Sequence, residues 1–245
     1  MKRLIHAFAM CRSMFCAIPS PGKVWDEEAR PLMLLCLPVL GLEIGLIWAA
    51  VAWLGHRLHL PEPIFALMIA LYPFAVTGGL HLDGFMDVTD AMKSYRSLER
   101  RREILKDSHV GAFAVVGVGM LLLAQYAAAS CLEGEQWVLI LIPVVSRCGS
   151  ALAVMLLKPM STSQYATQNI QKRYAPVVWG MLALALVFGS VLMERRGLAL
   201  LGGIAGYLWA LRRGYKSLEG MNGDISGYAL TISELCALVT LAVIS

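Results

Sequence analysis

Charged side chains are scarce in this sequence. Only 16% of its 245 residues are Asp, Glu, Lys or Arg, and 58% are hydrophobic. Soluble domains average about 25% charged residues, so the composition argues against a soluble domain and favours a polytopic membrane protein. No two cysteines have the Cys-x-x-Cys spacing, and four of the six lie in or beside apolar runs. This excludes a typical zinc site and indicates reduced cysteines that pack as small hydrophobic residues.

Internal repeats and low-complexity segments are also absent, whereas apolar runs are abundant. A membrane-spanning helix needs about 17–25 predominantly apolar residues. The candidates are 32–54, 63–81, 110–132, 137–157, 175–193, 197–211 and 227–244. The sixth run is short, so it either tilts with its neighbour or forms a hairpin with the fifth. The sequence therefore predicts one all-α domain over residues 1–245, a polytopic integral membrane helical bundle of six to seven transmembrane helices.

Basic residues are distributed unevenly between these runs. Seventeen of the 21 Lys and Arg residues lie in the segments 1–31, 82–109, 158–174 and 212–226. Three lie in the intervening loops 55–62, 133–136 and 194–196, and Arg147 is inside a run. Because cytoplasmic loops are enriched in Lys and Arg, the first set is predicted to be cytoplasmic. The net charge of +4 is then a topology signal and requires no nucleic-acid partner.

The first 30 residues are basic and apolar, as in a signal peptide, but Arg12 interrupts the apolar part and no clear cleavage site follows. They are predicted to form an uncleaved amphipathic segment at the cytoplasmic membrane surface.

Three aspartates lie within eight residues directly after the second apolar run: Asp83, Asp87 and Asp90. Their i, i+4, i+7 spacing places them on one face of a helix. Clustered carboxylates without nearby cysteine suit a hard cation such as Mg²⁺, and the basic residues that follow suggest a phosphate or pyrophosphate substrate. The alternative is a solvated helix start, with Asp83 as N-cap and the other two facing water.

Three further residues are candidates for substrate binding near this cluster. Lys106 and Ser108 directly precede a predicted span, a position that suits phosphate binding at a helix end. His81 lies at the expected membrane boundary, where it either contacts substrate or is a boundary histidine.

Two more polar positions lie farther along the chain. Arg147 is in the middle of a span, where a charge costs about 2.5–3.5 kcal/mol, so it is predicted to pair with Glu43 or with a substrate phosphate. The segment from Asn222 to Asp224 is either a turn or contributes a metal ligand or base to the first cluster.

These motifs resemble the cobalamin synthase family, adenosylcobinamide-GDP ribazoletransferases of the inner membrane. The resemblance is carried by GGLHLDGFMDVTDAM (78–92), EILKDSHVGAF (103–113), the pair Ser146-Arg147, and GMNGDISG (220–227) with Glu234. The first stretch is similar to the family pattern Gly-Gly-x-His-x-Asp-Gly-x-x-Asp-x-x-Asp at every fixed position. His109 and Asn222 depart from the Arg and Thr that the family often has there, and 161–174 contains no recognisable motif.

The resemblance implies a reaction in which adenosylcobinamide-GDP is joined to α-ribazole, or its 5′-phosphate, and GMP leaves. The product is adenosylcobalamin or its phosphate, and Mg²⁺ is the implied cofactor. The predicted metal ligands are Asp83, Asp87, Asp90 and Asp224. The predicted catalytic residues are Asp83, Asp87 and Asp224, and the predicted substrate-binding residues are His81, Lys106, Ser108, Arg147 and Asn222. Partners are these small molecules and the lipid bilayer, with an oligomer left open.

Two alternatives remain at this point. A CDP-alcohol phosphotransferase also places spaced aspartates at a membrane boundary, but Asp87 and Val88 occupy positions where that pattern has Ala and Arg. A polytopic transporter would use Arg147 and Glu43 along a path, although its site would be expected near the membrane midplane. The interpretation adopted is a multi-pass enzyme of the inner (plasma) membrane whose active site faces the cytoplasm.

Overall fold

The computed structural model describes residues 2–19, 24–134, 136–160 and 172–245, which form helices and connecting segments without a β-strand. The α-helices are α1 (Lys2–Phe15), α2 (Met33–Arg57), α3 (Glu62–Val76), α4 (Leu80–Lys93), α5 (Leu98–Ile104), α6 (Ala112–Ser130), α7 (Ile142–Leu156), α8 (Ala175–Leu192), α9 (Leu198–Leu218) and α10 (Gly223–Ile244). Short 3-10 helices are η1 (Arg30–Leu32), η2 (Trp137–Ile140), η4 (Lys172–Tyr174) and η5 (Glu194–Gly197). The all-α prediction is therefore confirmed for the described residues.

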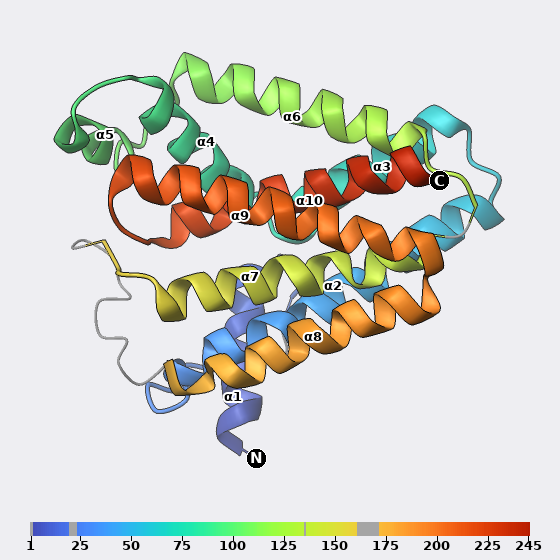
Figure 1. The fold of residues 1–245 in the computed structure, drawn as a ribbon, viewed down its shortest axis with the longest axis horizontal. Helices are drawn as coiled ribbons and strands as arrows, with labels where there is room; N and C mark the ends of the chain where they lie inside the picture. Colours follow the sequence, from blue (N-terminus) through green and yellow to red (C-terminus); the bar gives the residue numbers. More distant parts are fainter. Residues whose placement is uncertain (1, 20–23, 135, 161–171) are drawn as a thin grey trace.

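The long helices lie side by side along the longest axis of the molecule, whereas α1 crosses their direction (Figure 1). Five helical segments are long and apolar enough to cross a membrane: Arg30–Arg57, Ala112–Ser130, Trp137–Leu156, Lys172–Leu192 and Gly223–Ile244. A sixth results if α3 and α4 are taken together, which matches the lower end of the prediction. Helix α9 contains the short predicted run and has 21 residues, but its glycines and basic last turns reduce its hydropathy.

The predicted span 63–81 is not one continuous helix. Helix α3 ends at Val76, and α4 starts at Leu80 with its axis turned by 87°. Gly78 and Gly79 make this turn with φ of 60° and 80°, the left-handed region that glycine adopts without steric cost. Helix α4, which carries the aspartates, therefore changes direction at the end of α3.

Two predicted cytoplasmic loops are mostly helical. Segment 82–109 contains most of α4 and all of α5, and segment 212–226 contains the end of α9 and the start of α10. Residues 161–171 of the predicted loop 158–174 lie outside the described residues. Helices α4 and α5, the α9–α10 turn and the start of α8 lie at one end of the molecule, and the C-terminus lies at the other (Figure 1). The basic segments 82–109 and 212–226 therefore share one end.

Helices α7 and α10 form the centre of the bundle. Thirteen of the fifteen α7 residues are buried, and α10 packs against α4, α6, α7 and α9. Glycines on α9 allow close packing with α10, since a Cβ at Gly206 would lie 2.6 Å from Cys236 Cβ. This central position of α10 brings its N-terminal residues next to α4.

Candidate functional site

Helices α4 and α10 cross with their backbones almost in contact. A Cβ placed on Gly84 would lie 2.9 Å from the carbonyl oxygen of Asp224. About two turns farther along α10, Thr231 Oγ1 donates a hydrogen bond to the carbonyl oxygen of His81 at 3.2 Å. The rings of Phe85 and Tyr228 stack with centroids 5.6 Å apart. Two motifs separated by about 140 positions in the sequence thus meet at one place.

This crossing gathers three of the predicted site carboxylates. Asp83 is exposed and Asp87 is half-buried on α4, and Asp224 is half-buried in the first turn of α10. Asp83 and Asp224 both lie close enough to Asp87 to interact with it electrostatically. Like charges this close repel one another, and a bound cation would relieve the repulsion.

Asn222 is the N-cap of α10 and also fixes the Asp224 side chain. Its Oδ1 accepts a hydrogen bond from the N–H of Ile225 at 3.0 Å, and its Nδ2 donates to Asp224 Oδ2 at 2.6 Å. The amide side chain thus uses its acceptor for the helix and a donor for the carboxylate. This hydrogen bond holds the Asp224 carboxylate, which together with Asp83 and Asp87 forms the acidic group of the site.

Asp90 has a different environment from the other aspartates. Its two carboxylate oxygens accept hydrogen bonds from the backbone N–H groups of Gly111, at 2.6 Å, and Ala114, at 2.8 Å. These amides belong to the N-cap and first turn of α6, and this positive end of the helix favours an anion. Asp90 therefore caps α6 from a neighbouring helix. The alternative that Asp83 is the N-cap of α4 is wrong, because the cap residue is Gly79.

Lys106 and Ser108 lie in the exposed segment between α5 and α6. Between them, Asp107 accepts hydrogen bonds from the side chain and the backbone N–H of His109, and these bonds lower the pKa of Asp107. At the start of α6, where the sequence predicts phosphate binding, the backbone N–H groups of Gly111 and Ala114 already donate to Asp90. Lys106 and Ser108 are both exposed and lie at the same end of the molecule as the acidic group.

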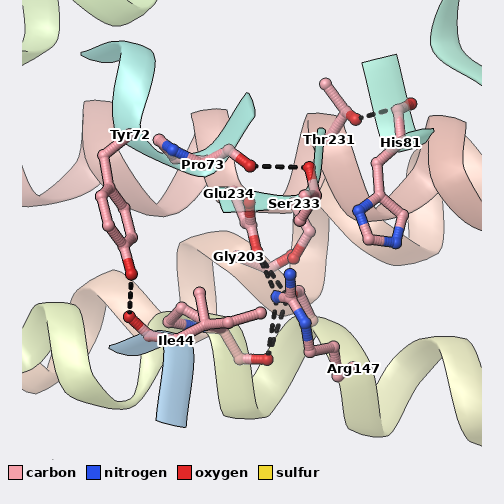
Figure 2. A network of polar contacts seen from close by, with 12 residues as sticks. Ile44, Tyr72, Pro73, His81, Arg147, Gly203, Thr231, Ser233 and Glu234 are labelled. Carbon is pink, nitrogen blue, oxygen red and sulfur yellow. Dashed lines mark hydrogen bonds and ion pairs between the residues drawn. The ribbon is translucent and has the colours of Figure 1, made fainter. Parts of the chain in front are cut away.

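Arg147 forms a buried ion pair with Glu234, 2.7 Å between Nη1 and Oε1 (Figure 2). Arg147 Nη1 also donates to the Pro143 carbonyl, and Ser146 Oγ donates to Glu234 Oε1. The predicted pairing of Arg147 with Glu43 is wrong, because Glu43 pairs with Arg12 at 2.8 Å. Glu234 accompanies one of the family-like motifs, but the motif does not identify it as the partner of Arg147. Its position within an apolar helix is a signal that it needs a partner.

His81 lies near this buried pair, separated from the acidic group. Two residues along a helix correspond to about 200° of rotation, so His81 and Asp83 project from opposite sides of α4. The imidazole stacks with Phe15 at 6.4 Å between centroids and lies beside the Arg147 network (Figure 2). Within the described residues its buried Nδ1 has no hydrogen-bond partner.

The carboxylate oxygens at the α4–α10 crossing are ligands of the kind that Mg²⁺ prefers in proteins. The described residues include no preformed group of three or more His, Cys, Asp or Glu side chains placed to hold a metal. Mg²⁺, however, commonly takes one or two carboxylates and fills its other positions with water and substrate phosphate oxygens. Asp83, Asp87 and Asp224 provide such oxygens, whereas those of Asp90 already accept two backbone hydrogen bonds.

The chain is similar to known proteins over nearly its whole length. A family model described as "Cobalamin-5-phosphate synthase" matches residues 7–242. An adenosylcobinamide-GDP ribazoletransferase of Clostridium botulinum (strain Alaska E43 / Type E3) is 34% identical, covering 97% of both chains. One of Clostridium perfringens (strain 13 / Type A) is 34% identical and covers 100% of both. No solved structure matches the chain.

Proposed function

The chain belongs to the cobalamin-5-phosphate synthase family, and from this premise we infer that it is an adenosylcobinamide-GDP ribazoletransferase. It joins adenosylcobinamide-GDP to α-ribazole, or to its 5′-phosphate, in a late step of cobalamin biosynthesis. The full-length similarity to relatives of that name supports this assignment. A CDP-alcohol phosphotransferase and a transporter are not favoured, since the family match covers both acidic motifs.

The reaction exchanges one phosphorus–oxygen bond for another. A ribose hydroxyl oxygen of the acceptor attacks the phosphorus that carries the cobinamide group. The bond from that phosphorus to the bridging oxygen breaks, GMP leaves with this oxygen, and the hydroxyl proton is released. Negative charge develops on the phosphoryl and leaving-group oxygens and must be stabilised.

The acidic group formed by Asp83, Asp87 and Asp224 would bind the cation that stabilises this negative charge. These carboxylates would hold Mg²⁺, which when bound neutralises phosphate oxygens and orients the pyrophosphate. Asp224, which Asn222 holds by a hydrogen bond, would either complete the metal site or receive the hydroxyl proton. Lys106 and Ser108 are exposed at the same end and would contact substrate phosphates.

Arg147 and His81 act farther inside the bundle. Arg147 is 1% exposed and already neutralised by Glu234, so we assign it to holding α7 against α10 beneath the site. The unpartnered Nδ1 of His81 remains available to a substrate group that reaches between the helices.

The observation that carries the proposal is the meeting of Asp83 and Asp87 with Asp224 at the α4–α10 crossing. The basic segments at the same end of the molecule support a site facing the cytoplasm, in the inner membrane of a bacterial cell.

The test is GMP release from adenosylcobinamide-GDP by the protein reconstituted into liposomes. Release should require both α-ribazole phosphate and Mg²⁺, and EDTA should abolish it. Asp83→Asn and Asp87→Asn should each reduce release by at least about 100-fold, because metal-ion stabilisation supplies several kcal/mol. Glu103→Gln is the control, since Glu103 is an exposed carboxylate at the same end. Unchanged turnover by a folded Asp83→Asn/Asp87→Asn variant would contradict the proposal.

A further inference from the structure

Helix α5 meets the C-terminal end of α9 at the left of Figure 1. A basic pocket lies at this junction. It has a volume of about 550 Å³. Its lining residues are Arg101, Trp209, Arg212, Arg213, Lys216 and Ser217. None of the residues assigned to the transferase reaction lines it, so the pocket has no role in the proposed function.

The pocket concentrates positive charge without matching acids. In the described part of the chain, none of its four cationic side chains forms an ion pair with Asp or Glu. Arg101 Nη1 donates to Ser217 Oγ at 2.6 Å, while its buried Nε has no hydrogen-bond partner there. Arg213 lies over the Trp209 ring at 5.3 Å. Glu99 interacts electrostatically with Arg101 but is fully solvated. The pocket therefore suits an anion.

The side of α9 that carries Arg212 and Lys216 also carries exposed apolar side chains. At about 100° per residue, Leu201, Leu208 and Trp209 share a side of the helix with Arg212 and Lys216. The two leucines are 53% and 59% exposed, and Trp209 is 54% exposed. A run of exposed apolar side chains that ends in Trp, Arg and Lys is typical of a helix leaving the hydrocarbon core at the headgroup layer.

We propose that this pocket binds the phosphate of an anionic phospholipid headgroup. Arg101, Arg212 and Lys216 hold the phosphate, and Trp209 forms the lipid-facing rim. Arginine suits phosphate because its planar donors match the phosphate oxygens, and basic pockets at the cytoplasmic side of membrane helices bind such headgroups. The proposal does not depend on the transferase function.

A bound headgroup also strengthens the junction between α5 and α9. Beside the pocket, Arg102 donates hydrogen bonds from Nε to the Leu218 carbonyl and from Nη2 to the Glu219 carbonyl, both at 3.0 Å. These carbonyls end α9 directly before the turn to α10. The lipid therefore stabilises the segment that leads to Asn222 and Asp224.

The test is thermal unfolding of the full chain in a neutral detergent, titrated with phosphatidylglycerol or with phosphatidylcholine. Phosphatidylglycerol should raise the unfolding midpoint, and phosphatidylcholine should not. Arg212→Gln/Lys216→Gln should need about 25-fold more phosphatidylglycerol for the same rise, at about fivefold per lost cation. Arg96→Gln/Arg195→Gln is the charge-matched control, because both arginines are exposed and lie outside the pocket.

Three results would overturn the proposal. One is a wild-type midpoint that does not respond to phosphatidylglycerol. A second is an equal loss of response in both double variants, which would indicate attraction to net charge alone. The third is an equally large rise with inorganic phosphate or GDP, which would assign the pocket to a soluble phosphate. Because unfolding is measured, none of these results depends on transferase activity.

Discussion

Arg147 and Glu234 form an ion pair almost completely withdrawn from solvent, with side chains 1% and 5% exposed. Two charges in such a position are stable only while each neutralises the other, because desolvation opposes both. Ser146 supports the pair by donating to the same carboxylate oxygen at 3.0 Å. Removing either charge leaves the other buried without compensation.

We therefore predict that Glu234→Gln lowers the free energy of unfolding by about 3–5 kcal/mol. Arg147→Gln/Glu234→Gln should lose less, because no unpaired charge remains. Denaturant unfolding in detergent measures both, with Glu103→Gln as control. Glu103 pairs with Arg100 at the exposed surface, where such pairs contribute about 0–1 kcal/mol. Equal losses in the single and double variants would contradict a coupled pair.

The sequence predicts that Arg147 needs a partner, but it does not identify which acid provides it. Both Glu43 and Glu234 lie within apolar runs, so hydropathy does not distinguish them. The choice depends on packing, because α7 brings Arg147 to α10, and α1 brings Arg12 to Glu43. For Asp90, too, the sequence does not identify the partner. Its spacing suggests a metal ligand, and only the position of α6 shows that it caps that helix.

At the scale of elements, the crossing of α4 and α10 depends on Gly84. A Cβ there would lie 2.9 Å from the Asp224 carbonyl oxygen and 3.0 Å from its Cα. These are backbone atoms, which cannot move aside as a side-chain tip can. Any side chain at position 84 must therefore push the start of α10, and Asp224 with it, away from α4.

Given the proposed function, Gly84→Ala should reduce kcat/KM for GMP release by about 100-fold, the usual cost of displacing a reacting group by about 1 Å. The control is Gly119→Ala on α6, where an added Cβ meets no atom within 4 Å and alanine favours the helix. Wild-type kinetics for Gly84→Ala would show that the close approach is not required.

Hydropathy and spacing predict most of the helices, since the long apolar runs and the helical face of aspartates are local patterns. The 87° turn after α3 could not be predicted in the same way. Gly78 and Gly79 follow an apolar run, and glycine is also common inside membrane helices. The predicted loop 212–226 contracts to a four-residue turn because α9 continues to Leu218 and Asn222 already caps the start of α10.

At the scale of the whole molecule, the distribution of charge agrees with the arrangement of helices. Helices α4 and α5 and the junction of α9 with α10 lie at one end, while the C-terminus and the loop after α6 lie at the other (Figure 1). The elements at the first end carry the acidic group and the residues that line the basic pocket. Loop 133–136 contains no Lys or Arg. From the positive-inside rule we therefore expect the loop after α6 to lie outside the cytoplasm.

One native cysteine allows this orientation to be tested. Cys131 at the end of α6 is exposed, whereas the other cysteines are buried or partly buried. A membrane-impermeant maleimide should therefore label Cys131 in right-side-out vesicles and not in inverted ones. The matched variant Cys131→Ser/Arg96→Cys moves the thiol to the basic end and should show the reverse pattern. If both proteins are labelled from the same side, the ends of the bundle do not face opposite compartments. If both patterns are inverted, the acidic group faces away from the cytoplasm and from nucleotide-linked substrates supplied there.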